Sequence, residues 1–240
     1  MKIEERVNPA RVRMLNGAPE KKGAVIYWMQ RDQRVHDNWA LLYAQELALS
    51  RKVPLIVLFC LIDKFSNAAY RHFAFMIKGL RQTEEEMNKF GIPFVLLRGD
   101  AGKKIAEFVK ETEAGALVTD FNPLKIVNKW KKEAAAGISI PFYEVDAHNI
   151  VPCFAASGKA EFGAYTIRPK IKRMLDDFLV EFPRVVKMKG NEGGIKNNWK
   201  EALDENLYDN SVREVKHILP GEDEGRSEEH TSELQSRSDL

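Results

Sequence analysis

One stretch of the sequence decides the fold: Ala24-Val-Ile-Tyr-Trp-Met-Gln-Arg-Asp-Gln-Arg-Val-His-Asp-Asn-Trp-Ala-Leu-Leu42. The apolar run at its start is typical of a strand that is buried on both faces. Asp37 or Asn38 suits the N-cap of a helix, whose apolar side would then include Trp39 and Leu42. The charged turn between strand and helix follows the carboxyl end of the strand, where open parallel sheets bind their ligands.

Four further apolar runs repeat this plan along the chain. They cover Pro54–Leu61, Ile92–Leu97, Ala116–Thr119 and Ile140–Val145, and amphipathic segments with helical spacing separate them. Alternating strands and helices predict right-handed βαβ crossovers and a parallel sheet with helices on both faces. We therefore expect an α/β fold, a Rossmann-like doubly wound domain with a five-stranded parallel sheet.

The composition indicates a globular protein without a membrane span. The chain has 240 residues, of which 44% are hydrophobic, and its formal net charge of +2 says little about its partners. No apolar run approaches the roughly 20 residues of a membrane-spanning helix, and the charged N-terminus is not that of a signal peptide. Cys60 and Cys153 form no CxxC motif or Cys/His cluster, which argues against a zinc site or a disulfide framework. We expect a cytoplasmic protein, or a nuclear one if the source is eukaryotic.

The segments around the repeat set the expected domain boundaries. Residues 1–22 are expected to be a basic lead-in with a short helix, and residues 23–183 to form the α/β domain. Residues 184–225 are expected to be an interdomain linker and the start of the missing helical domain. Near the end of the domain, Pro169 suits the first turn of a helix that would begin at Arg168.

Two further expectations concern the C-terminal part of the chain. Apolar residues beyond the polar, glycine-rich part of the linker are expected to be exposed; they are Trp199, Leu203, Leu207, Tyr208 and Ile218. Residues 226–240 carry no apolar stripe and resemble the translation of a sequencing-library adaptor. We expect them to be a non-native, disordered tail that contributes nothing to stability.

Polar or polarisable side chains stand where each predicted strand ends. Because the carboxyl ends of parallel strands meet at one edge of the sheet, these side chains should line a cleft for a flat, hydrogen-bonding molecule. Structural roles stay open for several of them: a turn salt bridge between Arg31 and Asp32, helix caps at Asp100 and Asp120, and a core histidine at His148. The candidate ligand contacts are Met29, Arg31, Asp32, Cys60, Asp100, Asp120, Phe121 and His148.

The usual nucleotide and hydrolase motifs are missing from the sequence. No GxGxxG follows the first strand, and neither a GxxxxGK[ST] loop nor a GxSxG elbow occurs. Dehydrogenases, P-loop enzymes and α/β-hydrolases therefore lose their strongest sequence support. We assign no catalytic residue and no metal ligand.

The residues at 25–42 resemble the opening motif of the photolyase/cryptochrome superfamily, which is a strand followed by Trp, Arg-Asp, Arg and Asp-Asn. The Met and Gln within the motif are similar to those of class II cyclobutane pyrimidine dimer photolyases, which are deoxyribodipyrimidine DNA photolyases. Other matching stretches follow in order, so the resemblance covers about residues 5–222; they are Phe73–Leu80, Leu117–Leu124, Val145–Cys153, Thr166–Lys170, Ser211–Lys216 and Pro220–Glu222.

The resemblance implies a two-domain flavoenzyme that repairs UV-damaged DNA. Its N-terminal α/β domain would hold an antenna chromophore of deazaflavin or folate type. A helical C-terminal domain would hold FAD and the flipped-out pyrimidine dimer. We expect this sequence to cover the antenna domain and linker without the helical FAD domain, so that the fragment alone would be inactive as a lyase. The full-length protein is expected to be a monomer.

Two other functions remain open from the sequence. A cryptochrome-like photosensor would share the same N-terminal motifs and signal without repair. A stand-alone α/β module that binds a nucleotide or a flavin would share the fold, which does not by itself determine function. An absorbance spectrum of the purified protein would help to separate them, because bound deazaflavin, folate and adenine nucleotide absorb at different wavelengths.

Overall fold

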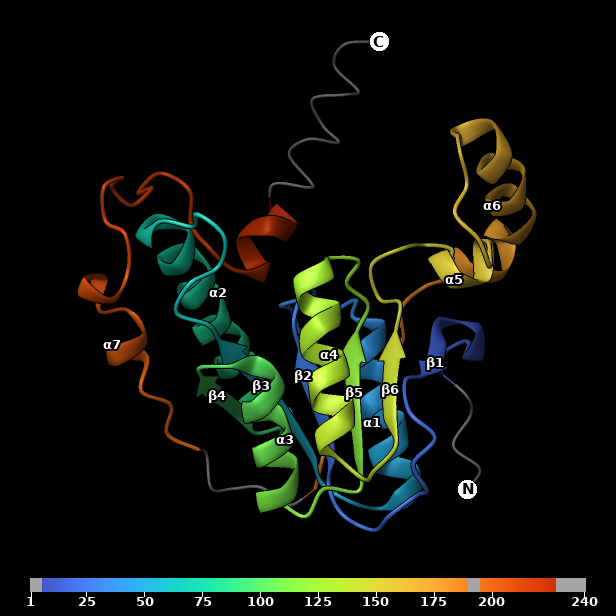
Figure 1. Cartoon of the computed structure of the whole chain (residues 1–240), viewed down its shortest axis with the longest axis horizontal. Helices are drawn as coiled ribbons and strands as arrows, with labels where there is room; N and C mark the ends of the chain where they lie inside the picture. Colours follow the sequence, from blue (N-terminus) through green and yellow to red (C-terminus); the bar gives the residue numbers. More distant parts are fainter. Residues whose placement is uncertain (1–5, 190–194, 228–240) are drawn as a thin grey trace.

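A computed structural model of the chain describes residues 6–189 and 195–227. In this part of the chain, six strands form one sheet in the order β1-β6-β5-β2-β3-β4, with helices packed around it (Figure 1). The strands are β1 Val12–Met14, β2 Val25–Met29, β3 Leu55–Leu61, β4 Phe94–Arg98, β5 Ala116–Asp120 and β6 Phe142–Val145. The helices are α1 Trp39–Arg51, α2 Tyr70–Lys89, α3 Ala101–Glu111, α4 Lys125–Gly137, α5 Cys153–Ala156, α6 Ala164–Phe178 and α7 Trp199–Ala202, and two 3-10 turns cover Pro9–Arg11 and Glu205–Leu207.

Strand β2 lies in the middle of the sheet and pairs in parallel with both β3 and β5. The chain proceeds from β2 through β3 to β4 on one side, and then crosses over to β5 and β6 on the other. The strand order therefore reverses between β2 and β5, which is where doubly wound sheets open a ligand crevice. Every residue of β2 and β5 is buried, as expected for strands that helices cover on both faces.

Alternate side chains of the strands supply two separate hydrophobic cores. Val25, Tyr27 and Met29 of β2 pack with α1 and α2 on one face of the sheet. Ile26 and Trp28 pack with α3 and α4 on the other face. The carboxyl end of β2 thus lies between two layers of helices. Its last two side chains, Trp28 and Met29, point to opposite layers.

The predicted five-stranded parallel sheet is confirmed in β2–β6, and the structure adds β1 at one edge. Strand β1 pairs antiparallel with β6, with Val12 opposite Val145. It lies in the segment 1–22, which was expected to be a short helix and a loose lead-in, and that expectation is wrong for Val12–Met14. Two of the three β1 residues are exposed, so the strand lacks the apolar run that would have revealed it.

Asn38, and not Asp37, caps helix α1. Its Oδ1 accepts hydrogen bonds from the backbone N–H groups of Ala40 and Leu41, at 3.0 and 3.1 Å. Its amide nitrogen donates to backbone carbonyls of the preceding turn. Because Asn38 is fully buried, this one side chain fixes the turn between β2 and α1 in place.

Helix α6 begins at Ala164, five residues before Pro169, and not at Arg168 as predicted. Proline at this position leaves the carbonyl of Tyr165 without its helical N–H partner. Tyr165 is 79% exposed, so water can bond that carbonyl. The helix therefore tolerates proline in its second turn, and it projects away from the sheet at the upper right of Figure 1.

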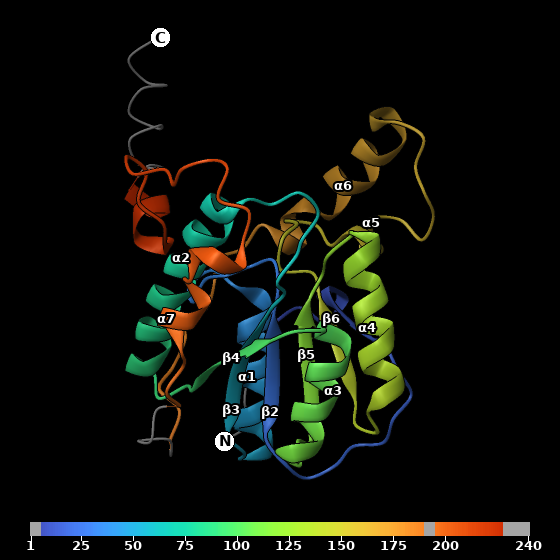
Figure 2. The ribbon, with the colours of Figure 1, turned by 60° about the vertical axis from the view of Figure 1, so that its left-hand side comes forward.

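The segment beyond α6 folds back along the α2 side of the domain. Trp199, Leu203 and Tyr208 pack against the core there, so the prediction that these three are exposed is wrong. Leu207 and Ile218 are 38% and 47% exposed, as predicted. Helix α7 lies beside α2 in Figure 1 and in Figure 2. Aromatic contacts hold it, with Trp199 stacked on Phe94 of the edge strand.

The beginning of the predicted tail is helical. Residues 222–227 form a helical segment, and Arg226 pairs with Asp37 at 2.8 Å. The prediction of disorder from residue 226 onward is therefore wrong at its start, and residues 228–240 lie outside the described residues. Within the described ranges, no helix combines the length and the apolar character needed to cross a membrane.

Candidate functional site

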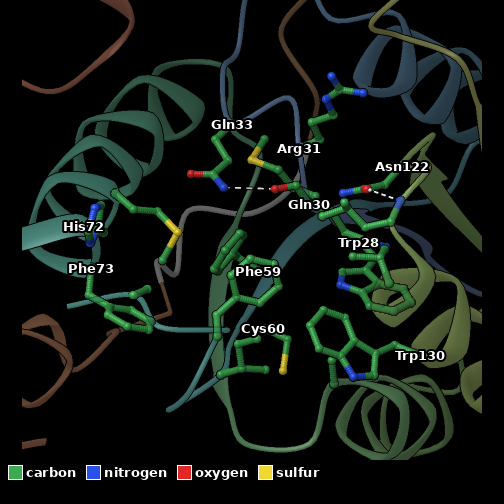
Figure 3. Close-up of a pocket in the computed structure, with 18 residues that line it drawn as sticks. Trp28, Gln30, Arg31, Gln33, Phe59, Cys60, His72, Phe73, Asn122 and Trp130 are labelled. Atoms are coloured by element: carbon green, nitrogen blue, oxygen red, sulfur yellow. Dashed lines mark hydrogen bonds between the residues drawn. The ribbon is translucent and has the colours of Figure 1, made fainter. Parts of the chain in front are cut away.

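A cavity of about 370 Å³ opens at the carboxyl ends of β2 and β3 and beside the loop that follows β5. Its volume lies in the range of small-molecule pockets, about 300–1,000 Å³. Most of its wall is aromatic or apolar and comes from both strands, from α2 and α4, and from the β3–α2 loop (Figure 3). These wall residues include Trp28, Phe59, Phe65, Phe73, Met76 and Trp130. Such a wall suits a planar aromatic molecule, which gains both ring contacts and release from water.

The fold explains why these side chains meet. Parallel pairing sets Met29 of β2 beside Phe59 of β3, so the two strands end together at the cavity. Helix α2 supplies Phe73 through its first turns, and α4 supplies Trp130 from the other layer. Phe65 and Trp130 have ring centroids 6.3 Å apart. The cavity is thus closed by residues from both cores at the point where the strand order reverses.

Asp120 holds the backbone of the β2–α1 loop at the rim of the cavity. Its carboxylate accepts hydrogen bonds from three consecutive backbone N–H groups, those of Gln30 at 3.1 Å, Arg31 at 2.6 Å and Asp32 at 2.7 Å. Asp120 is fully buried, and its burial and the neighbouring Asp32 carboxylate raise its pKa to about 7. Because Gln30 and Arg31 line the cavity, Asp120 positions part of the wall without being in it.

A charged cluster around Asp32 joins Arg31 of the cavity wall to groups that lie outside the wall. The side chains of Arg31 and His148 are joined by a 2.7 Å hydrogen bond between Nη2 and Nε2. Asp32 Oδ1 lies 3.4 Å from Arg34 Nη2 and 3.9 Å from His148 Nδ1. Burial raises the pKa of Asp32, and the nearby cations oppose that shift. The cluster links the β2–α1 loop to the loop after β6, so it sets the place of Arg31.

Three of the predicted ligand contacts, Met29, Arg31 and Cys60, line the cavity. Burial raises the pKa of Cys60 to about 12, so its neutral thiol belongs to the apolar wall. The structure places the other five predicted contacts outside the wall; they are Asp32, Asp100, Asp120, Phe121 and His148. For all eight residues, contact with a ligand stays a prediction.

Asp100 and Phe121, like Asp120, have clear structural roles. Asp100 caps helix α3, since its carboxylate accepts a hydrogen bond from the Lys103 N–H at 3.2 Å. The Phe121 ring meets Phe154 edge-on, with the ring centroids 6.3 Å apart. The alternative reading of Asp100 as a helix cap is therefore the one that the geometry supports.

Several wall residues were not among the predicted contacts. Phe65, His72 and Met76 come from the β3–α2 loop and from α2, and Asn122 follows β5. A search restricted to strand ends misses them, because a doubly wound crevice also takes side chains from the helices on either side. The signal that could have found them is the aromatic and histidine content at the start of α2, where His72 Nδ1 accepts from the Ala69 N–H at 3.1 Å.

The chain is similar to curated photolyases along most of its length. It is 41% identical over 231 residues to a deoxyribodipyrimidine photo-lyase of Arabidopsis thaliana, which covers 91% of this chain and 47% of the relative. It is 44% identical over 226 residues to one of Potorous tridactylus, covering 91% of this chain and 42% of the relative. The chain therefore spans a little under half the length of these relatives.

A solved structure shares the fold. The archaeal photolyase of Sulfolobus tokodaii, with two FAD molecules that implicate a novel light-harvesting cofactor, matches with a TM-score of 0.61 at 17% identity. The match covers 85% of this chain and 45% of that protein. In addition, residues 25–187 match the DNA photolyase family pattern, and they include all five parallel strands and every residue of the cavity wall. The chain therefore belongs to the DNA photolyase family.

Proposed function

We propose that this α/β domain is the antenna domain of a class II cyclobutane pyrimidine dimer photolyase, and that its cavity binds a light-harvesting chromophore. The observation that carries the proposal is an aromatic cavity at the switch point of the sheet, in a chain of this family. The class II assignment is supported by the residues at 25–42. A chromophore of deazaflavin or folate type has the planar ring that the wall suits.

The residues of the cavity would bind the chromophore and orient it. A bound chromophore would supply light absorption at this site. Trp28, Phe59 and Trp130 would contact the ring system and exclude water from it. Arg31 would contribute the positive charge at the rim, where it could face an anionic group of the chromophore. Asp120 would act through the backbone, because it fixes the loop that carries Arg31.

We also propose that the whole protein repairs UV-damaged DNA with FAD as its electron donor. The support is the similarity to relatives named deoxyribodipyrimidine photo-lyase, at 41% and 44% identity. In that function, excitation captured in the cavity would reach reduced FAD, which would donate an electron to the pyrimidine dimer. Family membership favours this function over a stand-alone nucleotide-binding module.

Titration of the purified chain with 8-hydroxy-5-deazariboflavin tests the chromophore site, with ligand fluorescence as the readout. Cys60→Leu adds bulk to the cavity wall, and overpacking of this kind costs about 1–3 kcal/mol. We therefore expect roughly tenfold weaker binding or more. Cys153→Leu is the matched control, because the other free cysteine lies outside the cavity wall and should leave binding unchanged. Equal affinity in all three proteins would place the chromophore elsewhere.

A further inference from the structure

The cavity borders the amino-terminal end of helix α4. Leu124, at the N-cap position, and Val127, in the first turn, both line it. No side chain of a described residue caps this end, and the first turn contains no acidic residue. The start of a helix carries a partial positive charge and N–H groups that have no partner within the helix. This part of the cavity wall therefore suits an anionic or strongly accepting group.

Asn122, two residues before the N-cap position, supplies a hydrogen-bond donor at the same place. Its Oδ1 accepts from the Leu124 N–H at 3.1 Å, which identifies Nδ2 as the other end of the amide. No described residue accepts a hydrogen bond from Nδ2, although Asn122 is only 8% exposed. Nδ2 is nevertheless not fully buried. Asn122 lines the cavity beside Trp28 (Figure 3), so a ligand there can reach this donor.

A buried group of charges holds the turn that carries Asn122. Lys131 of α4 is 3% exposed, and its Nζ donates to the Asn122 carbonyl at 3.4 Å and to one oxygen of the Glu144 carboxylate. Arg13 Nε donates to the other oxygen of that carboxylate at 2.6 Å. Two cations thus share one buried carboxylate, which leaves a net positive charge behind the turn. Because the Asn122 carbonyl and Oδ1 are both bonded, its free amide N–H₂ is preoriented.

The carboxylate of Asp120, two residues before Asn122, is directed elsewhere. It accepts hydrogen bonds from three backbone N–H groups of the β2–α1 loop. Burial raises the Asp120 pKa to about 7, so below that pH the group is mostly neutral and opposes an anion little. The charged or titratable groups on the elements around this end of α4 are Arg13, Arg31, Asp32, His72, Asp120, Lys125, Lys131, Glu144 and His148.

We propose that Asn122 Nδ2 and the amino-terminal end of α4 form a subsite for an anionic oxygen on a planar ring. The oxygen accepts from Asn122, the helix end and the buried cations stabilise its charge, and the ring packs against Trp28. This inference rests on the proposed function and deepens it, because it selects the chemical class of the chromophore. A deazaflavin with an ionised 8-hydroxyl group carries such an oxygen, whereas the pterin ring of a folate is neutral near neutral pH.

Two deazaflavins that differ in one group test the subsite. 8-Hydroxy-5-deazariboflavin loses a proton to give the anionic oxygen, and 8-amino-5-deazariboflavin carries a neutral donor of similar size instead. We expect the chain to bind the ionised hydroxy compound at least about tenfold more tightly, measured by ligand fluorescence. The amino compound sets its own donor against Asn122 Nδ2 and leaves that group unpaired.

Asn122→Asp should abolish this preference. The variant retains the oxygen that accepts from the Leu124 N–H, so the turn keeps its hydrogen bond, but it sets a carboxylate against the ligand oxygen. We expect it to bind the hydroxy compound at least about tenfold more weakly than wild type does. Asn128→Asp is the matched control, because it makes the same change of charge further along α4 and outside the cavity wall. It should keep the preference.

The absorbance of the bound ligand gives a second readout that needs no variant. The neutral and ionised forms of 8-hydroxy-5-deazariboflavin have different spectra. Tenfold tighter binding of the ionised form lowers the pKa of the bound ligand by about one pH unit. At the pH where the free compound is half ionised, the bound compound should therefore be about nine-tenths ionised.

The outcomes separate this inference from the proposed function. Equal affinity for the two deazaflavins, with the bound hydroxy compound ionised no more than the free one, would overturn the inference and leave the chromophore site standing. A preference that Asn122→Asp leaves intact would overturn it as well, and so would tighter binding of pterin than of the hydroxy compound. Failure of both deazaflavins and of pterin to bind would contradict the proposed function, and the inference with it.

Discussion

At the scale of single residues, Asp120 decides the shape of the loop beside the cavity. Its two carboxylate oxygens accept hydrogen bonds from three consecutive backbone N–H groups. Asp120→Asn removes one acceptor oxygen and turns an amide N–H₂ toward those donors. We expect a loss of about 1–3 kcal/mol in the free energy of unfolding, measured by urea denaturation. Asp100→Asn is the control, because asparagine caps a helix as well as aspartate does.

The stability difference between wild type and Asp120→Asn should depend on pH. Burial, and then the Asp32 charge, raise the pKa of Asp120 from its usual 3.8 to about 7, against the effect of the N–H donors. Because the folded pKa is the higher one, the stability that protonation contributes is complete below about pH 4 and is lost as the pH rises through about 7. The advantage of wild type over Asp120→Asn should therefore shrink over this range and stay constant above it.

Paired urea unfolding at several pH values checks this expectation. Taking the difference between the two proteins removes most of the contribution of the nearby Asp32 carboxylate, whose pKa burial also raises. An advantage of wild type that grows as the pH rises would contradict the prediction. It would mean that the three N–H donors outweigh burial and keep the Asp120 pKa low.

At the scale of elements, two side-chain amides attach the segment after α6 to the domain. Asn197 bonds the free edge of β4: its Oδ1 accepts from the Leu96 N–H at 2.8 Å, and its Nδ2 donates to the Phe94 carbonyl at 2.9 Å. Gln45 of α1 exchanges two hydrogen bonds with the backbone of Val186, at 2.8 and 3.1 Å. Each side-chain amide both donates to and accepts from the backbone, as a neighbouring strand would. Asn197 also covers a sheet edge that would otherwise be open.

Asn197→Ala should therefore open the edge of the sheet locally. Without the amide, the Leu96 N–H loses its partner, and we expect its hydrogen exchange to become roughly tenfold faster or more. Asn206→Ala is the matched control, because that exposed side chain donates to Asp204 in its own turn and to no other residue that the structure describes. Unchanged exchange at Leu96 would show that other contacts hold the segment on β4.

The sequence predicted the elements whose signal is local. Strands β2–β6 are short apolar runs between polar turns. Because both faces of such strands are buried, nearly all of their residues are apolar, and the run can be recognised in the sequence. Strand β1 and the packing of Trp199 depend on partners more than a hundred residues away. Alternation or helical spacing within one segment cannot reveal them. The same limit applies to the segment 184–225, which was predicted to be an interdomain linker and the start of a helical domain, and whose packing on the sheet edge has no local signal.

The candidate site was predictable at the strand ends and not between the layers. Met29, Arg31 and Cys60 line the cavity because they follow or end central strands. Asp120 is also at a strand end, yet its carboxylate turns to the backbone of the neighbouring loop. A buried carboxylate needs donors, and the nearest ones were backbone N–H groups whose position depends on the tertiary fold. Residue type alone therefore located the edge of the sheet but not the direction of each side chain.

At the scale of the whole molecule, a buried arginine joins the α5–α6 unit to the main domain. Arg11 is 1% exposed, and its guanidinium donates to four backbone carbonyls, those of Asp146, Asn149, Ile150 and Phe178. It also lies over the ring of Trp39 of α1, at 4.7 Å from the centroid, and over the Phe178 ring at 5.1 Å. Burial lowers the Arg11 pKa to about 10, so the group stays charged at neutral pH.

The α5–α6 unit has only a small hydrophobic cluster of its own, centred on Val151, Ala156 and Phe178. Its attachment should therefore depend on Arg11. Lysine keeps the charge, but a point-like ammonium cannot reach four carbonyls or stack on two rings. We expect Arg11→Lys to lower the free energy of unfolding by at least about 2 kcal/mol, since buried carbonyls lose their donors.

Limited proteolysis locates the effect of this change. In Arg11→Lys, cleavage in the 157–163 loop should become several-fold faster than in wild type, because the unit detaches from the sheet before the domain unfolds. Arg81→Lys is the control: Arg81 and Glu85 form an exposed pair one turn apart on α2, at 3.6 Å, and lysine can keep that pair at a cost of under about 1 kcal/mol. If both variants lost the same stability and the loop were cut at the wild-type rate, Arg11 would be an ordinary buried ion and not the link between the two parts of the molecule.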